Sequence, residues 1–278
     1  MQHSTNPHHT TNQTKMNPSQ PTPTQPTSSQ PTPSPTILIM AGGLGKRMNS
    51  TIPKVLHCVN SRPMLIRCIE AASQLNPESI IIITPKSDFL IKRCLFMHLP
   101  SSILNIIVYI PQLEPLGTGH AVKSAEQYFS TKLTNLLIMP ADVPLISTQM
   151  LSDMWSSHLN SKMSATILTT WLDNPTGNGR IILDTTNTFI KIQEEKDCSP
   201  EQKQIQMVNA GLYVFKTDVL FDFLKQVGNS NAQREYYLTD VFELMISNGS
   251  KINTIFSNSS KSLINVNSPK DLALAESV

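Results

Sequence analysis

The sequence lacks an excess of charge of either sign. Its 278 residues carry 22 basic and 20 acidic side chains, which gives a formal net charge of +2. Proteins that bind nucleic acid usually carry a strongly basic surface, so the near balance argues against that class. Hydrophobic residues make up 39% of the chain, which argues against wholesale disorder.

Long apolar runs and closely spaced cysteines are also missing. The apolar runs at residues 79–84 and 103–110 fall well short of the roughly 20 residues that a membrane-spanning helix needs, so no contact with a membrane is expected. No two cysteines form a CxxC pair, which excludes a zinc ribbon and a thioredoxin-type redox site. Without a secretory signal, we expect four reduced thiols in a cytoplasmic protein.

The first 36 residues differ in composition from the rest of the chain. Pro, Thr, Ser and Gln fill 27 of these 36 positions. Such a segment buries too little apolar surface to offset its chain entropy, so residues 1–36 are predicted to form a disordered tail. A role in docking or tethering stays open. Residues 37–278 have the length of one α/β domain.

Segments typical of strands and helices alternate after the tail. Continuous apolar runs predict buried strands, and apolar residues at helical spacing predict amphipathic helices. Strands are predicted at 36–40, 79–84, 103–110, 135–139, 165–171, 189–193, 211–215 and 252–256. Helices are predicted at 64–75, 90–99, 120–129, 148–158, 219–226 and 239–247. This alternation indicates parallel βαβ units, whose ligands bind beyond the carboxyl ends of the strands.

A glycine-rich loop follows the first predicted strand. Residues 41–54 read AGGLGKRMNSTIPK, and backbone N–H groups can approach an anion closely where Cβ is missing. A P-loop would need Ser or Thr where Arg47 stands, and a dinucleotide-binding fingerprint would need a third glycine where Met48 stands. Both of these common phosphate-binding motifs are therefore excluded.

The loop resembles the signature of sugar-phosphate nucleotidylyltransferases, in which an Arg-Met pair and a Pro-Lys pair follow the glycines. Further matching stretches are PKVLH at 53–57, LGTGHAV at 116–122, ADVPLI at 141–146, DNPTGNGRI at 173–181, EEKD at 194–197, EQKQIQMVNAG at 201–211 and NAQREYYLTD at 231–240. They cover nearly all of residues 37–270. The chain is thus similar to the uridylyltransferase domain of bacterial bifunctional UDP-N-acetylglucosamine pyrophosphorylase/glucosamine-1-phosphate N-acetyltransferase.

The resemblance implies a Rossmann-like α/β domain with a mixed, mostly parallel sheet flanked by helices, the nucleotide-diphospho-sugar transferase fold. It implies an enzyme, a uridylyltransferase that transfers UMP from UTP to N-acetylglucosamine 1-phosphate, releases pyrophosphate and uses Mg²⁺ as cofactor. The bifunctional proteins continue into a β-helix that carries acetyl transfer and builds a trimer. This sequence shows no hexapeptide repeat, so neither acetyltransferase activity nor a trimer is expected.

The resemblance also implies roles for single residues. Arg47 and Lys54 would be catalytic, since a guanidinium binds two phosphate oxygens and lysine supplies a point charge. Asp142 and Asn267 would bind Mg²⁺, which usually takes one or two protein oxygens. Implied substrate contacts are Met40, Ala41, Gly42, Gly43 and Gly45 in the glycine-rich loop, Gln112, Gly117 and Thr118 for uracil, and Gly177, Glu194 and Asn209 for N-acetylglucosamine, with Asn267 also touching substrate.

Other interpretations of these residues stay open. Pro115 stands where the family often has a second glutamine for uracil, so another nucleotide or sugar phosphate is an alternative substrate. A non-catalytic sugar-nucleotide-binding protein is an alternative of another class, as is an interaction protein that works through its tail. Taken singly, Gln112 could be an exposed loop residue, Asn267 an N-cap, and Glu194 part of a solvated charged run.

Overall fold

The computed structural model describes residues 1, 32–43 and 45–278. The disordered tail predicted for residues 1–36 thus lies largely outside the described residues. Its last four residues belong to the compact unit Pro33–Val278. The Pro35 carbonyl accepts a hydrogen bond from the Glu78 N–H at 2.9 Å. The division of the chain at residue 36 stays a prediction.

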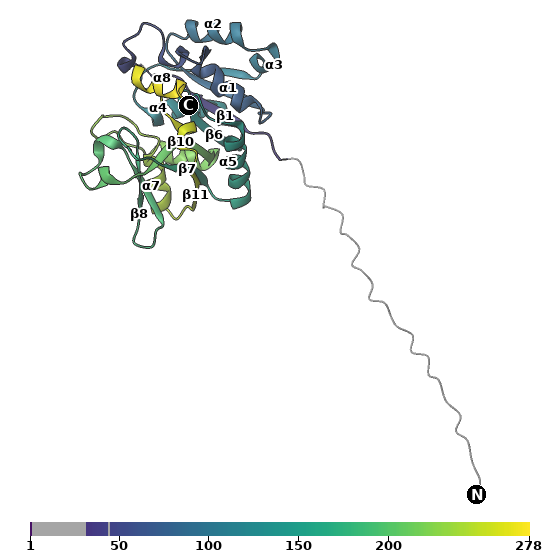
Figure 1. Cartoon of the computed structure of the whole chain (residues 1–278), viewed down its shortest axis with the longest axis vertical. Helices are drawn as coiled ribbons and strands as arrows, with labels where there is room; N and C mark the ends of the chain where they lie inside the picture. Colours follow the sequence, from purple (N-terminus) through teal and green to yellow (C-terminus); the bar gives the residue numbers. More distant parts are fainter. Residues whose placement is uncertain (2–31, 44) are drawn as a thin grey trace. The chain divides into compact units, whose positions relative to one another are not determined.

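A nine-stranded sheet forms the centre of the described domain (Figure 1). Its main path is β11-β7-β10-β6-β1-β4-β5, and β8 joins β9 to β10. The strands are β1 (Thr36–Met40), β4 (Ser79–Pro85), β5 (Ile107–Gln112), β6 (Asn135–Pro140), β7 (Ala165–Trp171), β8 (Arg180–Leu183), β9 (Phe189–Gln193), β10 (Met207–Lys216) and β11 (Ile252–Ser257). A separate small hairpin joins β2 (Cys58–Val59) to β3 (Arg62–Pro63).

Most neighbours along this path run parallel. Strands β6, β1, β4 and β5 are parallel to one another, as are β7 and β11. Strand β10 is antiparallel to both β6 and β7. Because parallel strands end at the same edge of a sheet, the residues after β1, β5 and β6 meet there. The mixed, mostly parallel sheet predicted from the sequence is confirmed.

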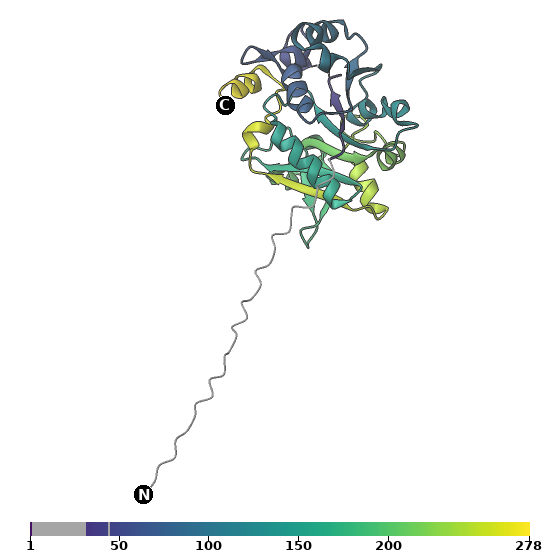
Figure 2. The ribbon, with the colours of Figure 1, turned by 90° about the vertical axis from the view of Figure 1, so that its right-hand side faces the viewer.

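The central strands are apolar on both faces because helices cover both faces of the sheet (Figure 2). In β1, Ile37 and Ile39 pack into one core cluster with α1, α2 and α5, whereas Leu38 packs into another with α4, α6 and α7. All three side chains are fully buried. The helices are α1 (Met64–Ser73), α2 (Phe89–His98), α3 (Ser101–Leu104), α4 (Thr118–Lys123), α5 (Thr148–Ser161), α6 (Thr217–Leu224), α7 (Asp240–Ser247) and α8 (Pro269–Glu276).

Three predicted elements are wrong in part. The strand predicted at 103–110 begins only at Ile107, because the residues after Pro100 form the short helix α3. A short apolar run does not by itself distinguish a strand from a helical segment. The helix predicted at 120–129 is divided into α4 and a 3₁₀ turn over Glu126–Phe129. The prediction at 211–215 covers only the second half of β10. The elements β2, β3, β8, α3 and α8 were not predicted.

No helix of the described part is long and apolar enough to cross a membrane. All four cysteines, Cys58, Cys68, Cys94 and Cys198, are free thiols.

Candidate functional site

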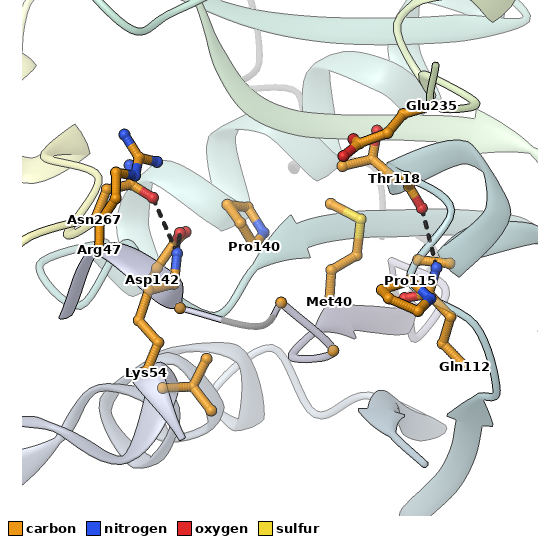
Figure 3. Close-up of a pocket in the computed structure, with 16 residues that line it drawn as sticks. Met40, Arg47, Lys54, Gln112, Pro115, Thr118, Pro140, Asp142, Glu235 and Asn267 are labelled. Carbon is orange, nitrogen blue, oxygen red and sulfur yellow. Dashed lines mark hydrogen bonds and ion pairs between the residues drawn. The ribbon is translucent and has the colours of Figure 1, made fainter. Parts of the chain in front are cut away.

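A pocket of about 450 Å³ opens where β1, β5 and β6 end (Figure 3). Most residues predicted from the sequence line it: Met40, Gly42, Gly43, Gly45, Arg47, Lys54, Gln112, Gly117, Thr118, Asp142 and Asn267. This is the edge of an open α/β sheet where ligands are expected. Ala41 does not line the pocket. Its side chain is buried, and its N–H donates to the Ile83 carbonyl at 2.9 Å.

One wall of the pocket brings Lys54, Asp142 and Asn267 together. The Lys54 ammonium forms an ion pair with Asp142 Oδ2 and donates to Asn267 Oδ1 at 3.0 Å. The side chains of Lys54 and Asp142 are only 12% and 16% exposed, so solvent screens this pair far less than it screens a surface pair. A carboxylate oxygen and an amide oxygen from distant parts of the chain therefore contact the same ammonium group.

Backbone contacts hold these two oxygen donors side by side. Asp142 follows β6, and its carbonyl accepts from the Val266 N–H at 2.9 Å. The Asn267 N–H donates to Asp271 Oδ2 at 3.0 Å. Ser268, whose hydroxyl accepts from the Asp271 N–H, is the N-cap of α8. Asn267 is therefore not the N-cap, and its side chain is free to reach into the pocket.

The donor set fits a hard divalent cation. Asp142 Oδ2 and Asn267 Oδ1 both contact the Lys54 ammonium, which occupies the position that a metal ion would take. Asp142 Oδ1 is buried with no hydrogen-bond partner among the described residues. Mg²⁺ commonly takes one or two protein oxygens and completes its shell with water and phosphate. Within residues 32–43 and 45–278 no group of three or more His, Cys, Asp or Glu could hold a metal, so substrate or water oxygens would be needed.

The glycine-rich loop turns tightly at Gly45. Its φ of +58° lies in the left-handed region, and a Cβ there would stand 2.7 Å from Lys54 Cβ, so glycine is required on both counts. The turn leads into a 3₁₀ turn over Lys46–Met48 that places Arg47 at the pocket, where it is exposed. An exposed guanidinium at this mouth can bind an incoming phosphate.

Gln112, at the end of β5, is held in one orientation. Its side chain is 7% exposed, so the interpretation as an exposed loop residue is wrong. Its Nε2 donates to the Gly117 carbonyl and lies beside His120 Nδ1, both at 3.1 Å. Its Oε1 lies toward the glycine-rich loop, 3.0 Å from where a Cβ on Gly42 would be. The amide oxygen is therefore the group that Gln112 can offer to a ligand.

The loop that carries Gly117 and Thr118 is joined to the chain around Tyr236. The Tyr236 N–H donates to the Leu116 carbonyl at 2.8 Å, and the Tyr236 carbonyl accepts from the Gly119 N–H at 2.7 Å. The Leu238 N–H donates to Thr118 Oγ1 at 3.0 Å. At Gly117, φ is +115° and a Cβ would meet the Tyr236 carbonyl oxygen at 2.6 Å, so this close approach needs glycine.

The residues predicted to bind the sugar, Gly177, Glu194 and Asn209, do not line the pocket. Two of them flank Gly179: a Cβ on this glycine would lie 3.6 Å from Glu194 Oε2 and 3.7 Å from Asn209 Cβ. The 177–179 segment is linked to the segment that carries Asn267, since Asn265 Nδ2 donates to Asn178 Oδ1 at 3.3 Å. These predicted contacts thus form a second group, and their role stays a prediction.

Glu194 and Asn209 already have partners inside the protein. Burial raises the pKa of the Glu194 carboxyl, against a hydrogen bond from Thr239 Oγ1 at 2.7 Å that lowers it. Glu194 therefore does not belong to a solvated charged run. Asn209 is 9% exposed, its Nδ2 donates to the Tyr213 hydroxyl at 2.6 Å, and its Oδ1 accepts from the Gly211 N–H at 3.0 Å.

Several pocket residues were not among the predicted site residues: Val55, Pro115, Ala121, Pro140 and Glu235. Glu235 is the one with chemistry to offer, since it brings a carboxylate to the side of the pocket that carries Thr118 (Figure 3). Glu235 directly precedes Tyr236, whose backbone is hydrogen-bonded to the loop around Gly117. That pairing is invisible in the sequence.

Comparison with known families identifies the chain. Residues 36–261 match the profile of the family described as Nucleotidyl transferase. The chain belongs to the nucleotidyl transferase family. The resemblance to sugar-phosphate nucleotidylyltransferases found in the sequence is thereby confirmed.

Two relatives of this nucleotidyl transferase are similar over most of the domain. The chain is 37% identical over 245 residues to the "Probable UDP-N-acetylglucosamine pyrophosphorylase" of Acanthamoeba polyphaga mimivirus, covering 87% of this chain and 95% of that protein. It is 38% identical over 241 residues to the "Bifunctional protein GlmU" of Clostridium beijerinckii, covering 87% of this chain and 51% of that protein. The chain therefore spans about half the length of the bifunctional relative.

Solved structures show the same fold at low sequence identity. The structure of UDP-glucose pyrophosphorylase complexed with UDP-glucose has a TM-score of 0.70 and 17% identity, covering 88% of this chain and 97% of that one. At this identity the likeness establishes the fold alone. The predicted nucleotide-diphospho-sugar transferase fold is confirmed.

Proposed function

We propose that this nucleotidyl transferase is a UDP-N-acetylglucosamine pyrophosphorylase, which transfers UMP from UTP to N-acetylglucosamine 1-phosphate and releases pyrophosphate. The observation that carries the proposal is the convergence of Lys54, Asp142 and Asn267 in the pocket that also holds the glycine-rich loop. The similarity to the mimivirus pyrophosphorylase, nearly all of whose length the chain covers, supports this choice of substrates.

The reaction needs no protein nucleophile. A phosphate oxygen of the sugar phosphate attacks the α-phosphorus of UTP in line, a new P–O bond forms, and the bond between the α-phosphorus and the bridging oxygen breaks as pyrophosphate leaves. Catalysis then consists of positioning and charge stabilisation. Arg47 and the amides of the glycine-rich loop would bind the triphosphate, and Lys54 would neutralise charge on the reacting phosphates.

Mg²⁺ is the cofactor that we propose for this site. Asp142 and Asn267 would hold it, and when bound it would supply positive charge that neutralises phosphate oxygens. The Lys54 ammonium would then leave Asp142 for the substrate phosphates, since two cations cannot share the same two oxygens at contact distance.

The remaining predicted contacts divide between the two substrates. Gln112, Gly117 and Thr118 would bind the uracil base, with the Gln112 amide oxygen accepting from a base N–H. Gly177, Glu194 and Asn209 would bind N-acetylglucosamine, after a change in the partners that the last two now have. We also propose a cytoplasmic location, which the four free thiols support.

The test is a nucleotide panel. Purified protein is mixed with Mg²⁺ and N-acetylglucosamine 1-phosphate, and pyrophosphate release is followed with UTP, dTTP, CTP, ATP and GTP in parallel. We expect release with UTP alone. Silence with all five nucleotides would contradict the proposal and point to another sugar phosphate or to a binding protein.

Two variants test the role of the pocket wall formed by Lys54, Asp142 and Asn267. Asp142→Ala should abolish turnover, because it removes the one carboxylate of the proposed metal site. Its circular dichroism spectrum should match that of the wild type. Asp153→Ala, on the exposed side of α5, is the matched control and should keep full activity. Turnover by Asp142→Ala would remove the basis of the metal assignment.

A second candidate function is the same chemistry on another nucleotide. The observation that favours it is Pro115, which lines the pocket near the proposed uracil contacts and offers no side-chain hydrogen bond to a base. In the panel, this candidate predicts release with dTTP or another nucleotide at a rate equal to or above that with UTP.

A further inference from the structure

Arg180, the first residue of β8, is a charged side chain sealed inside the domain. It is 1% exposed. Its Nη1 donates to the Asn178 carbonyl, and its Nη2 donates to the Lys203 carbonyl at 3.2 Å and pairs with Glu195 Oε2 at 2.6 Å. One guanidinium thus joins three segments that are separate in the sequence.

This arrangement is a poor stabiliser of the fold. Removing an arginine from water costs several kcal/mol, here against a carboxylate that stays 24% exposed, and well-packed apolar residues of similar volume are often as stable or more so. Moreover, Arg180 Nε is buried without a hydrogen-bond partner among the described residues, which adds to the cost. Stability alone therefore does not explain a buried arginine at this position.

Two of the three partners of the Arg180 guanidinium, Asn178 and Glu195, stand next to residues that we propose to bind the sugar; the third, Lys203, does not. Asn178 directly follows Gly177, and Glu195 directly follows Glu194. In the sheet, Arg180 is paired with Val208, the residue before Asn209. Each of the three residues that we propose to bind the sugar thus lies one position from a residue that Arg180 contacts or pairs with.

Backbone contacts next to Arg180 also hold the residues proposed to bind the sugar in place. The Asn209 N–H donates to the Gly179 carbonyl at 2.9 Å. A Cβ on Gly179 would stand 2.8 Å from a methyl group of Ile192, so the strand approaches its neighbours as closely as glycine permits. The segment 177–180 is therefore held on one side by Asn209 and on the other by the Arg180–Glu195 pair.

We infer that Arg180 is a positioning residue for the sugar end of the substrate. Its guanidinium fixes the 177–179 segment and the segment that begins at Glu194 relative to each other, so that their polar groups face one ligand in a constant geometry. The inference rests on the proposed function, because it takes the sugar to bind Gly177, Glu194 and Asn209. Arg180 itself does not touch the substrate.

The test compares the two substrates in one variant. In Arg180→Met, the KM for N-acetylglucosamine 1-phosphate should rise about tenfold or more while the KM for UTP changes less than about twofold, because only the sugar contacts lose their alignment. Arg180→Lys should recover part of the loss by restoring a cation. Arg62→Met, which breaks the half-exposed pair with Glu70, is the matched control and should leave both KM values unchanged.

A second variant covers the case in which Arg180→Met does not fold. Glu195→Gln keeps the size of the partner and removes its charge, and it should raise the KM for the sugar phosphate with the same selectivity. Equal changes in both KM values, or unchanged values in folded Arg180→Met or in Glu195→Gln, would overturn the inference. Failure of the proposed function would be seen separately, as wild-type protein that neither turns over these substrates nor binds UDP-N-acetylglucosamine in calorimetry.

Discussion

Lys54 and Asp142 form an ion pair inside the pocket, and the same ammonium also donates to Asn267 Oδ1 at 3.0 Å. The Lys54 ammonium thus lies between the two oxygens, Asp142 Oδ2 and Asn267 Oδ1, that we propose as metal ligands. A divalent cation and the ammonium would compete for these oxygens, since like charges at contact distance repel strongly in a partly buried site. If the proposed metal binds here, its binding and the movement of Lys54 toward phosphate should therefore be coupled.

Replacing Lys54 should strengthen metal binding while it removes activity. Without nucleotide, Lys54→Met should bind Mn²⁺ about tenfold more tightly than wild type, a difference of roughly 1.4 kcal/mol, because no ammonium has to be displaced. The affinity can be measured by electron paramagnetic resonance of free Mn²⁺. Lys92→Met, which removes a half-exposed lysine that pairs with Asp88, should bind Mn²⁺ as wild type does. Equal affinity in all three proteins would contradict the coupling.

Gly117→Ala should disturb both folding and nucleotide binding. The new methyl group would meet the Tyr236 carbonyl oxygen at 2.6 Å in a backbone with φ of +115°, a conformation that costs a non-glycine residue about 1–3 kcal/mol. We expect a lower midpoint of thermal unfolding and a higher KM for UTP. Gly228→Ala, where a Cβ would find nothing within 4 Å, is the control, and a Gly117→Ala protein that matches it would refute the steric argument.

Asp240 should make the protein less stable as the pH rises. Burial first, and then the negative charges of Glu194, Glu243 and Asp197, raise the pKa of the Asp240 carboxyl from 3.8 to about 6. Between these values the folded protein holds a proton that the unfolded chain has lost, so the free energy of unfolding falls as the pH rises from about 4 to about 6.

Asp240→Asn should remove this loss. At pH 7.5 the free energy of unfolding should increase by about 1 kcal/mol, a value reduced because the carboxyl is only half-buried and partly screened by solvent. At pH 4 it should hardly change. Asp153→Asn, at an exposed position of α5, is the control. Chemical denaturation at both pH values gives the comparison, and an equal effect at pH 4 and pH 7.5 would contradict the assignment.

His158 should make the protein less stable in acid. It is 2% exposed, and its ring nitrogens lie 2.9 Å from Thr166 Oγ1 and 3.2 Å from Asn135 Oδ1. Burial, with a smaller effect of Lys216, lowers the pKa of His158 from 6.5 to about 4. The unfolded chain therefore binds a proton that the folded protein rejects, and up to about 3 kcal/mol of stability is lost as the pH falls from 6.5 to 4.

His158→Gln should flatten this acid dependence, although the variant is less stable at neutral pH. His158→Gln and the parent protein with which it is compared should both carry Asp240→Asn. Without that change, the contribution of Asp240 to the free energy of unfolding would vary in the opposite direction over the same pH range. Thermal unfolding between pH 4 and 7 provides the measurement. An acid slope that survives in His158→Gln would show that another group is responsible.

The sequence predicted best those features that depend on neighbours along the chain. The strand at 36–40 has the predicted bounds because an unbroken apolar run carries its own conformational preference. The strand predicted at 103–110 failed at its start, where Pro100 favours the short helix α3. There the local apolar pattern was compatible with both structures.

By itself the sequence determined the fold class, the order of the elements, the family and most of the residues that line the pocket. Only the tertiary structure decided how side chains far apart in the sequence pair: Lys54 on Asp142 and Asn267, Glu235 at the pocket, and Arg180 between the segments at 178, 195 and 203. The physical reason is the separation along the chain of the residues that interact. Backbone conformation follows from adjacent residues, whereas an ion pair or a buried hydrogen bond depends on the packing of the whole chain.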